Sequence, residues 1–417
     1  MLRRRSHNGK GGDNVTQASE SWRPVTLIQV DVDALSSALP PRVAPGDRIW
    51  IEAVKQGRMV GVVVARAGSD GLPESVLQQL ATTYSNVESS LPARLPDEML
   101  AKASVVVPTL CRNRDELVRT VESLLSLDYP DFEVIVVDNR FGTNLDPLPD
   151  FPGGERVRVV AEPRRGVSAA RNRGIAVSIG DFLAFTDDDA AVSPDWLRAI
   201  GTRFALDAEV EGIGGLVLPM ELETAPQLWF EEFYGGFSPS FRAEKLSLRL
   251  LKGTDPMFPY AVGRFGAGCN MAYRRATFER IGGFDVNIGG GTLAKGGEDV
   301  AMAVELVLTG GTFAYEPAAV VRHTHRRTEA EFMSQVFNYG TGLTAMYTAM
   351  IVRDPRHLIG MIRRIPVGLR YLTRPPAQRS PSLTPSYPRR TLVHQVLGMV
   401  YGPLAYIRSL VRTHWLT

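Results

Sequence analysis

Cysteine is almost absent from this sequence, which has only Cys111 and Cys269 among its 417 residues. Two cysteines do not make a disulfide framework of the kind that holds small secreted domains together, and such scarcity is typical of a reducing compartment. We therefore interpret each cysteine as a small, buried hydrophobic residue. Long apolar runs are missing too, and none reaches the length of a membrane-spanning helix.

A secretory signal is also missing, because no apolar segment follows the three arginines at positions 3 to 5. We expect a cytoplasmic protein, peripheral at the inner face of the membrane, in which residues 1–20 are disordered. The chain is long enough for two or more domains with a substantial core.

Acidic residues and lysine are scarce in the last fifth of the chain. From Glu331 onward there are eleven arginines, no lysine and two acids, whereas the first 330 residues carry 36 bases and 43 acids. This asymmetry predicts an anionic partner, such as a membrane surface, for a helical extension over residues 331–417. The alternative is an amphipathic helical cap on the preceding domain. Nucleic acid is not an expected partner, because no recognised binding module accompanies the arginines.

Residues 21–100 are predicted to form a small β-rich domain. Alternating apolar residues predict three strands and one helix, at Val25 to Val32, Arg48 to Val54, Met59 to Ala65 and Glu74 to Tyr84. The segment Ser85 to Lys102 reads as a linker. Acceptor recognition and contact in a homo-oligomer are the two roles considered for this domain.

Strands and helices alternate over residues 101–330, which predicts an α/β domain with an open, mainly parallel twisted sheet flanked by helices. The expected strands include Ser104 to Val107, Phe132 to Val137, Val157 to Ala161 and Asp181 to Phe185. Later, we expect an irregular aromatic segment from Thr224 to Asp255 and two closing strands, Thr312 to Tyr315 and Ala319 to Val321. Aromatic residues between Trp229 and Phe241 could stack an acceptor sugar or lipid, or simply pack the core.

Three adjacent carboxylates, Asp187, Asp188 and Asp189, follow the apolar run Phe182 to Phe185. Because like charges repel, a divalent cation such as Mn²⁺ or Mg²⁺ would stabilise this cluster, and ligands bind at the carboxyl ends of parallel strands. The alternative is an exposed acidic turn before a helix that starts near Pro194, with Ser193 as N-cap.

Two further polar loops follow predicted strands. The loop Pro108 to Arg114 opens a helix, and helix N-termini suit phosphates, with Arg112 or Arg114 assisting. Asp138 ends the next strand, and Arg171 lies one turn into the helix after Gly166. Surface arginines and capping groups are the alternative interpretation of these residues.

An acidic pair, Glu298 and Asp299, begins an apolar helix after a glycine-rich loop. Compensation of the helix dipole would explain such a pair. The functional interpretation is a general base held at a mobile, closable site.

Seven short motifs occur in order between Ala103 and His325, and together they resemble the inverting GT-A glycosyltransferases, the large family-two group. These motifs are Val106-Val-Pro-Thr109, Val136-Val-Asp-Asn139, Gly166-Val-Ser-Ala-Ala-Arg-Asn-Arg-Gly174, Phe185-Thr-Asp-Asp-Asp189, Gly268-Cys-Asn-Met-Ala272, Ile281-Gly-Gly-Phe-Asp285 and Gly297-Glu-Asp299. The resemblance implies a nucleotide-diphospho-sugar transferase fold.

The resemblance also implies a role for each matching residue. Asp138 would hold the base of the donor, Arg171 would lie near the base and diphosphate, and Asp187 would face the ribose or sugar. Asp189 would bind the metal with Asp187, and His323 would be a third metal or diphosphate contact, with His325 as its rival. Asp299 would be the catalytic base beside Glu298. The remaining donor-site candidates are Pro108, Thr109, Arg112, Asp188 and Asn270, of which Asn270 would line the sugar and acceptor pocket.

The implied reaction moves a sugar from a nucleotide-diphosphate sugar to the hydroxyl of a glycan, a lipid-linked molecule or a small molecule, with a divalent cation. The sequence departs from the family where Asp138-Asn-Arg-Phe141 replaces the frequent Asp-Asp-x-Ser, so the base is not fixed as uracil. A sugar nucleotidylyltransferase and a non-catalytic nucleotide-sugar-binding module are the alternatives.

Overall fold

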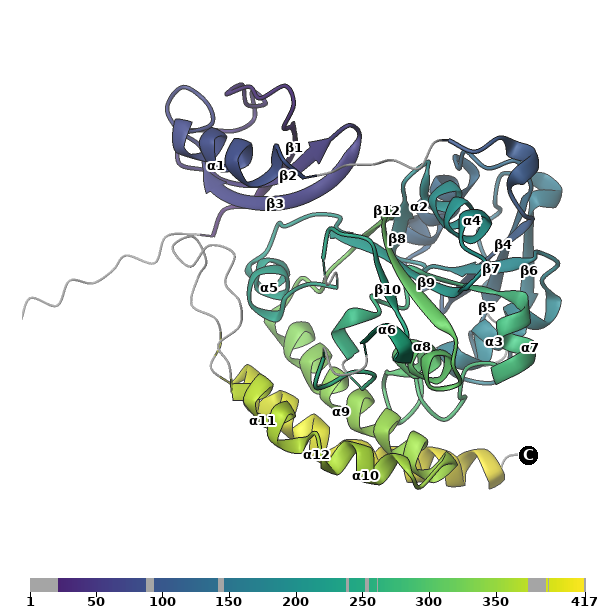
Figure 1. The fold of residues 1–417 in the computed structure, drawn as a ribbon. Coiled ribbons are helices and arrows are strands. Elements are labelled where there is room, and N and C mark those ends of the chain that lie inside the picture. Colours follow the sequence, from purple (N-terminus) through teal and green to yellow (C-terminus); the bar gives the residue numbers. More distant parts are fainter. Residues whose placement is uncertain are drawn as a thin grey trace, which may run out of the picture.

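The computed structural model describes residues 22–87, 94–141, 146–237, 240–251, 255–260, 262–373, 388 and 390–415 (Figure 1). The disorder expected for residues 1–20 falls outside this part of the chain, as does most of the proline-rich stretch before residue 390. Among the described residues, no helix is both long enough and apolar enough to cross a bilayer.

The N-terminal part is a three-stranded sheet covered by one helix. It consists of β1 (Thr26–Asp31), β2 (Arg48–Lys55), β3 (Arg58–Arg66) and α1 (Glu74–Tyr84). β1 and β2 are parallel, and β2 and β3 form an antiparallel hairpin. Gln56 and Gly57 both have positive φ angles, which a two-residue turn of this twist requires. The expected strands and helix are therefore all present.

This small sheet packs against the larger domain. Trp50 and Val64 share a buried cluster with Leu222 and Leu228. Arg322 of the larger domain also forms an ion pair with the buried Glu52 on β2. Figure 1 shows the small sheet as a layer of its own beside the larger domain.

A nine-stranded sheet forms the centre of the larger domain, with the order β10-β12-β9-β11-β7-β4-β5-β6 and with β8 beside β12. Its strands are β4 (Ala103–Thr109), β5 (Phe132–Asp138), β6 (Val157–Ala161), β7 (Phe182–Phe185), β8 (Ala190–Val192), β9 (Val210–Pro219), β10 (Glu244–Leu246), β11 (Met271–Arg274) and β12 (Thr312–His323). The pairs β4–β5, β4–β7, β5–β6 and β9–β12 are parallel, and β8, β10 and β11 run antiparallel to their neighbours. The predicted mainly parallel α/β fold is confirmed.

Helices cover both faces of this sheet, because its central strands are apolar on both sides. One face packs under α2 (Arg114–Leu125) and α4 (Trp196–Leu206). The other face packs under α3 (Val167–Val177), α7 (Arg275–Ile281) and α8 (Glu298–Leu308). Both clusters leave the carboxyl ends of the central strands free for polar side chains.

Three local expectations were wrong. α4 begins at Trp196 after Asp195, so Ser193 is not its N-cap. β12 is one strand with a register shift between Glu316 and Val320, where two strands were expected. The segment from Thr224 is partly regular, because a capping box starts α5 (Ala225–Trp229), a π-helical turn follows, and β10 pairs with β12.

The C-terminal extension is helical, as predicted, with α9 (Glu329–Arg353), α10 (His357–Ile362), α11 (Ile365–Thr373) and α12 (Thr391–Trp415). Gly340 and Gly342 lie inside α9 without breaking it. A Cβ at Gly340 would collide with the backbone of α12 at Gln395, so this glycine permits the close helix contact seen along the lower edge of Figure 1.

Candidate functional site

One edge of the central sheet gathers most of the predicted site residues. β4 ends at Thr109, β5 ends at Asp138, and β12, which runs parallel to them, ends at His323. Asp187, Asp188 and Asp189 follow the end of β7, which lies beside β4. The carboxyl ends of parallel strands are where open α/β sheets bind their ligands.

Asp189 and His323 face each other at this edge. The Asp189 Oδ1 atom lies 3.1 Å from His323 Nε2. Burial alone would raise the pKa of Asp189, but the charge of His323 and its hydrogen bond outweigh burial and lower that pKa to about 2. The reciprocal attraction raises the pKa of His323 against the opposing effect of burial. Each partner of this contact therefore favours the charged form of the other.

Arg171 connects the acidic turn to the acidic pair of α8. Its guanidinium, of which only 2% is exposed, lies 2.7 Å from Glu298 Oε1 and 3.3 Å from Asp187 Oδ1. It also donates a hydrogen bond of 3.2 Å to the carbonyl oxygen of Gly268. A buried arginine requires such partners, because an unpaired charge in the interior is strongly unfavourable. Residues 16 and 127 positions apart from Arg171 are thus held in one cluster.

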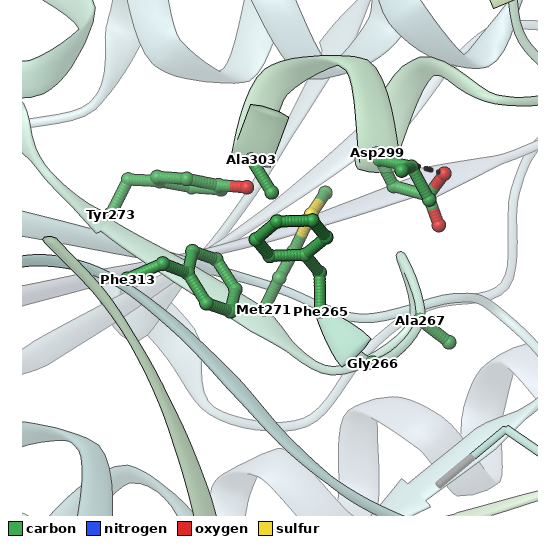
Figure 2. Close-up of a pocket in the computed structure, with 9 residues that line it drawn as sticks. Phe265, Gly266, Ala267, Met271, Tyr273, Asp299, Ala303 and Phe313 are labelled. Carbon is green, nitrogen blue, oxygen red and sulfur yellow. Dashed lines mark hydrogen bonds between the residues drawn. The ribbon is translucent and has the colours of Figure 1, made fainter. Parts of the chain in front are cut away.

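Asp299 lies at the same cluster. Its Oδ2 atom accepts a hydrogen bond of 2.7 Å from the backbone N–H of Gly268, and its Oδ1 atom accepts from the N–H of Val300. Figure 2 shows Asp299 at the start of α8, beside a pocket with largely apolar walls. Within that pocket, the Tyr273 hydroxyl finds no hydrogen-bond partner among the described residues. A carboxylate fixed by backbone donors at an apolar pocket has the form expected of a base.

Glu298, the neighbour of Asp299, is buried under Arg171. Burial and the adjacent charge of Asp299 raise the pKa of Glu298 to about 7, and the ion pair with Arg171 opposes this rise. Glu298 therefore points toward the interior and positions Arg171, while Asp299 is the member of the pair that lines the pocket.

The donor-site candidates at and after the end of β4 differ in their surroundings. Thr109 donates a hydrogen bond of 2.5 Å from its hydroxyl to Asp188 Oδ2. Burial raises the pKa of Asp188 to about 6, although the bond from Thr109 opposes the rise. Pro108 is a buried residue within β4, not the residue after it, and Arg112 is exposed in the loop before α2.

Asp138 is held by Arg140, two residues further on. The Arg140 guanidinium donates to both carboxylate oxygens, at 2.8 and 2.7 Å, and these bonds lower the pKa of Asp138. The next residue, Asn139, accepts from the N–H of Gly166 and so fixes the start of α3. Neither contact was predicted, although Asn139 and Gly166 belong to two of the seven motifs.

The structure corrects the expectation for Asn270. This side chain is fully buried, accepts a hydrogen bond from the indole N–H of Trp196 and donates to the carbonyl oxygens of Leu216 and Ala319. Its polar atoms are thus used between β9, β12 and α4, so it does not line a sugar pocket. A buried amide requires hydrogen-bond partners of this kind. The sequence alone does not distinguish an asparagine that bonds to its own fold from one that bonds to a ligand.

The two histidines at and after the end of β12 have separate surroundings. His323 faces Asp189, whereas His325 Nε2 lies 2.7 Å from Glu231 Oε1 on the π-helical turn. Phe230 packs against His325 and, with Trp229, against Phe332 of α9. Packing therefore explains much of the aromatic segment, and its role in acceptor binding stays a prediction.

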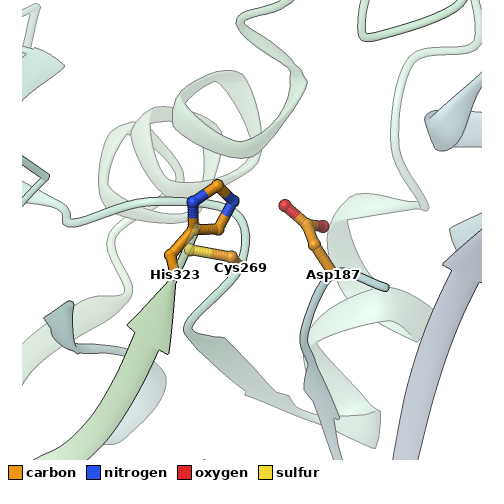
Figure 3. A group of neighbouring side chains, drawn as sticks. All are labelled: Asp187, Cys269 and His323. Carbon is orange, nitrogen blue, oxygen red and sulfur yellow. The ribbon is translucent and has the colours of Figure 1, made fainter. Parts of the chain in front are cut away.

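Three different donor atoms converge beside Asp189. A carboxylate oxygen of Asp187, the Cys269 sulfur and a ring nitrogen of His323 all lie within 4.8 Å of one another (Figure 3). These atoms fit one divalent cation, because oxygen and nitrogen donors bind Mn²⁺ and related ions and sulfur binds borderline ions. Cys269 is buried, as expected, but no pattern of residues indicated its place among these donors.

This geometry agrees with the comparison of the chain with known proteins. Residues 104–282 match the family described as Glycosyl transferase family 2. This part of the chain is therefore a glycosyltransferase domain of the GT-A class, and the resemblance inferred from the seven motifs is confirmed.

Individual relatives align over similar regions. The chain is 29% identical over 191 residues to the glucosyl-dolichyl phosphate glucuronosyltransferase of Haloferax volcanii, covering 45% of this chain and 57% of that protein. It is 29% identical over 241 residues to the pre-mycofactocin glycosyltransferase of Mycobacterium tuberculosis, covering 57% of this chain and 46% of that one. The chain thus spans about half the length of these curated relatives. A mannosyltransferase from Pyrobaculum calidifontis, solved in complex with GDP-Man and Mn²⁺, aligns with a TM-score of 0.42 and 18% identity, over 78% of this chain and 91% of that chain.

Proposed function

We propose that this protein transfers a sugar from a nucleotide-diphosphate sugar to an acceptor hydroxyl, with inversion at the anomeric carbon. The observation that carries the proposal is the Arg171 cluster, which holds the acidic turn after β7 and the acidic start of α8 at one site. A single displacement needs a donor site and a base on opposite sides of one sugar, and this cluster supplies both.

Asp299 is the general base in this proposal. Its carboxylate is oriented by the Gly268 N–H at 2.7 Å, and the apolar pocket beside it limits competition from water. A base must lie within hydrogen-bond reach of the acceptor hydroxyl whose proton it takes. Because the acceptor oxygen attacks the anomeric carbon directly, no covalent intermediate forms and the configuration inverts.

Asp187, Asp189 and His323 hold a divalent cation, Mn²⁺ or Mg²⁺, next to the donor. When bound, the cation neutralises the charge that develops on the departing diphosphate. Arg171 fixes the Asp187 carboxylate from behind, at 3.3 Å, so that the metal-binding turn keeps its shape. Thr109 and Asp188 brace the same turn against β4, and Asp138 and the N-terminus of α2 are available to the base and phosphates of the donor.

A panel of nucleotide sugars tests the proposal. We expect one donor class to raise the melting temperature only with Mn²⁺ or Mg²⁺ and to release its nucleoside diphosphate, and both effects to vanish with EDTA or in Asp189→Ala. The exposed Asp195→Ala is the matched control. Stabilisation without turnover for any acceptor would favour a non-catalytic binding module. Release of pyrophosphate from a nucleoside triphosphate and a sugar phosphate would favour a nucleotidylyltransferase.

We also propose that the C-terminal extension binds an anionic membrane surface, where a hydroxyl acceptor could be presented. α12 exposes an apolar stripe of residues spaced three and four apart, namely Val393, Val396, Leu397, Val400, Leu404, Ile407 and Val411. The same helix exposes Arg408 and Arg412, and α10 adds Leu358, Ile359 and Ile362. Apolar side chains flanked by arginines favour a helix lying in the plane of an anionic bilayer.

A further inference from the structure

Cys269 lies where a metal-binding site of oxygen and nitrogen donors does not need a sulfur. Its Sγ atom is within 4.8 Å of both a carboxylate oxygen of Asp187 and a ring nitrogen of His323. Two ligands of one cation at bond lengths of about 2.0 to 2.3 Å are separated by no more than about 4.6 Å, so the spacing is close to that of a shared ion. Figure 3 shows the three side chains arriving from separate segments, with the Asp187 carboxylate directed toward His323 and the Cys269 sulfur beside the His323 side chain.

The position of Cys269 is fixed by both of its neighbours. Gly268 accepts a hydrogen bond from Arg171 through its carbonyl and donates one to Asp299 through its N–H. Asn270 is buried in three hydrogen bonds to Trp196, Leu216 and Ala319. The backbone that carries the thiol therefore cannot move away from Asp187 without breaking one of these contacts. Rigid neighbours on both sides are the support that a metal ligand needs.

We propose that Cys269 is a fourth protein ligand of the cation held by Asp187, Asp189 and His323. This inference rests on the proposed function, because it assigns a further ligand to the same cation. A thiolate added to two carboxylates and an imidazole makes a mixed donor set that suits Zn²⁺ and Co²⁺ far better than Mg²⁺. The site thus binds a borderline metal tightly even without a nucleotide, whereas Mg²⁺ requires the donor phosphates to complete its coordination.

Cobalt spectroscopy tests this assignment without measuring turnover. The full chain, stripped of metal with EDTA and kept reduced, is titrated with Co²⁺. We expect an intense sulfur-to-cobalt charge-transfer band in the near ultraviolet that is absent from Cys269→Ser. Cys111→Ser is the matched control, because Cys111 is the other cysteine of the chain and its sulfur is not one of the three converging donor atoms. This control should keep the full band.

Competition by other metals gives a second readout. Zn²⁺ should displace Co²⁺ and remove the band, and Cys269→Ser should weaken Zn²⁺ binding by at least about 10-fold. Isothermal titration of the metal-free protein with Zn²⁺ measures this loss.

The outcomes separate this inference from the function on which it rests. Cobalt binding with visible bands but no sulfur band, together with normal nucleotide binding, would overturn the role of Cys269 and leave the transferase proposal standing. Failure of every cation and of every nucleotide to bind would overturn both. A sulfur band that persists in Cys269→Ser would show that cobalt is bound elsewhere and would also overturn the assignment.

Discussion

At the scale of the residue, the site depends on one buried arginine. Arg171 pairs with two carboxylates from distant parts of the chain. It also bonds to the carbonyl oxygen of Gly268, the residue whose N–H donates to Asp299. The sequence could predict that Asp187, Asp189 and Asp299 matter, because acidic residues at strand ends and helix starts are visible in the pattern. It could not predict that Asn270 serves the fold or that Cys269 joins the metal donors, because both follow from tertiary contacts alone.

Replacement of Asp299 by asparagine tests the base directly. Asparagine keeps the shape of the side chain and can still accept the hydrogen bond from Gly268, but it cannot take a proton. We expect kcat for sugar transfer to fall about 10² to 10⁴-fold, with the dissociation constant of the donor unchanged by calorimetry. Asp195→Asn, at a mostly exposed side chain, should match the wild type. Undiminished turnover in Asp299→Asn would refute the base assignment.

At the scale of the element, the amino ends of β4, β5 and β6 are tied together by Glu133, at the edge of the sheet opposite the site. This carboxylate accepts hydrogen bonds from Ser104 at 2.7 Å, from Arg158 at 2.6 Å and from the N–H of Ile179 at 2.8 Å. Burial would raise the pKa of Glu133, but these bonds outweigh burial and lower it.

The lowered pKa gives a stability difference with a defined pH dependence. The ionised carboxylate stabilises the fold fully above its unfolded pKa near 4.5 and loses this effect as the pH falls through the lower folded value. We expect Glu133→Gln to cost about 2 kcal/mol in urea unfolding at pH 7, and the difference from wild type to shrink steadily below pH 4.5. The control Glu155→Gln, at an exposed residue, should change the free energy of unfolding little at pH 7 or below pH 4.5. A difference between Glu133→Gln and wild type that stays constant with pH would count against this ion network.

The pairing of α9 and α12 is the second feature at this scale. A Cβ at Gly398 would overlap the carbonyl oxygen of Phe337, so the backbones of α9 and α12 meet closely at this glycine. We expect Gly398→Ala to destabilise the extension by about 1 to 3 kcal/mol, seen as faster proteolysis of α12. Gly368→Ala in α11 is the control, because its Cβ would have Met257 at 3.7 Å as its nearest neighbour and alanine favours helix. Equal proteolysis of the two variants would contradict the close packing.

At the scale of the whole molecule, the charge asymmetry of the sequence coincides with an exposed apolar stripe, which only the structure reveals. The helical extension was predicted from the sequence, but which side of α12 faces α9 depends on packing. The small N-terminal sheet was also predictable as strands, whereas its contact with Leu222, Leu228 and Arg322 was not.

Flotation with vesicles tests the membrane surface. The full chain should float with anionic phosphatidylserine vesicles and should float less at high salt. It should not float with neutral phosphatidylcholine vesicles. Val400→Glu combined with Leu404→Glu should abolish flotation, while Val159→Glu, at a half-exposed valine on β6, should not. If the stripe instead joins two copies of the chain, size-exclusion chromatography would show a dimer that the double variant converts to a monomer. The double variant would then float as the wild type does, and the membrane proposal would be refuted.

The contact between the start of α8 and the middle of α9 has a mechanical consequence. A Cβ at Gly297 would lie 2.6 Å from the carbonyl oxygen of Gly342, so the two main chains touch one residue before Glu298. A displacement of α9 would therefore reach the backbone before Glu298 and Asp299 directly, because no side chain lies between the two main chains at this point.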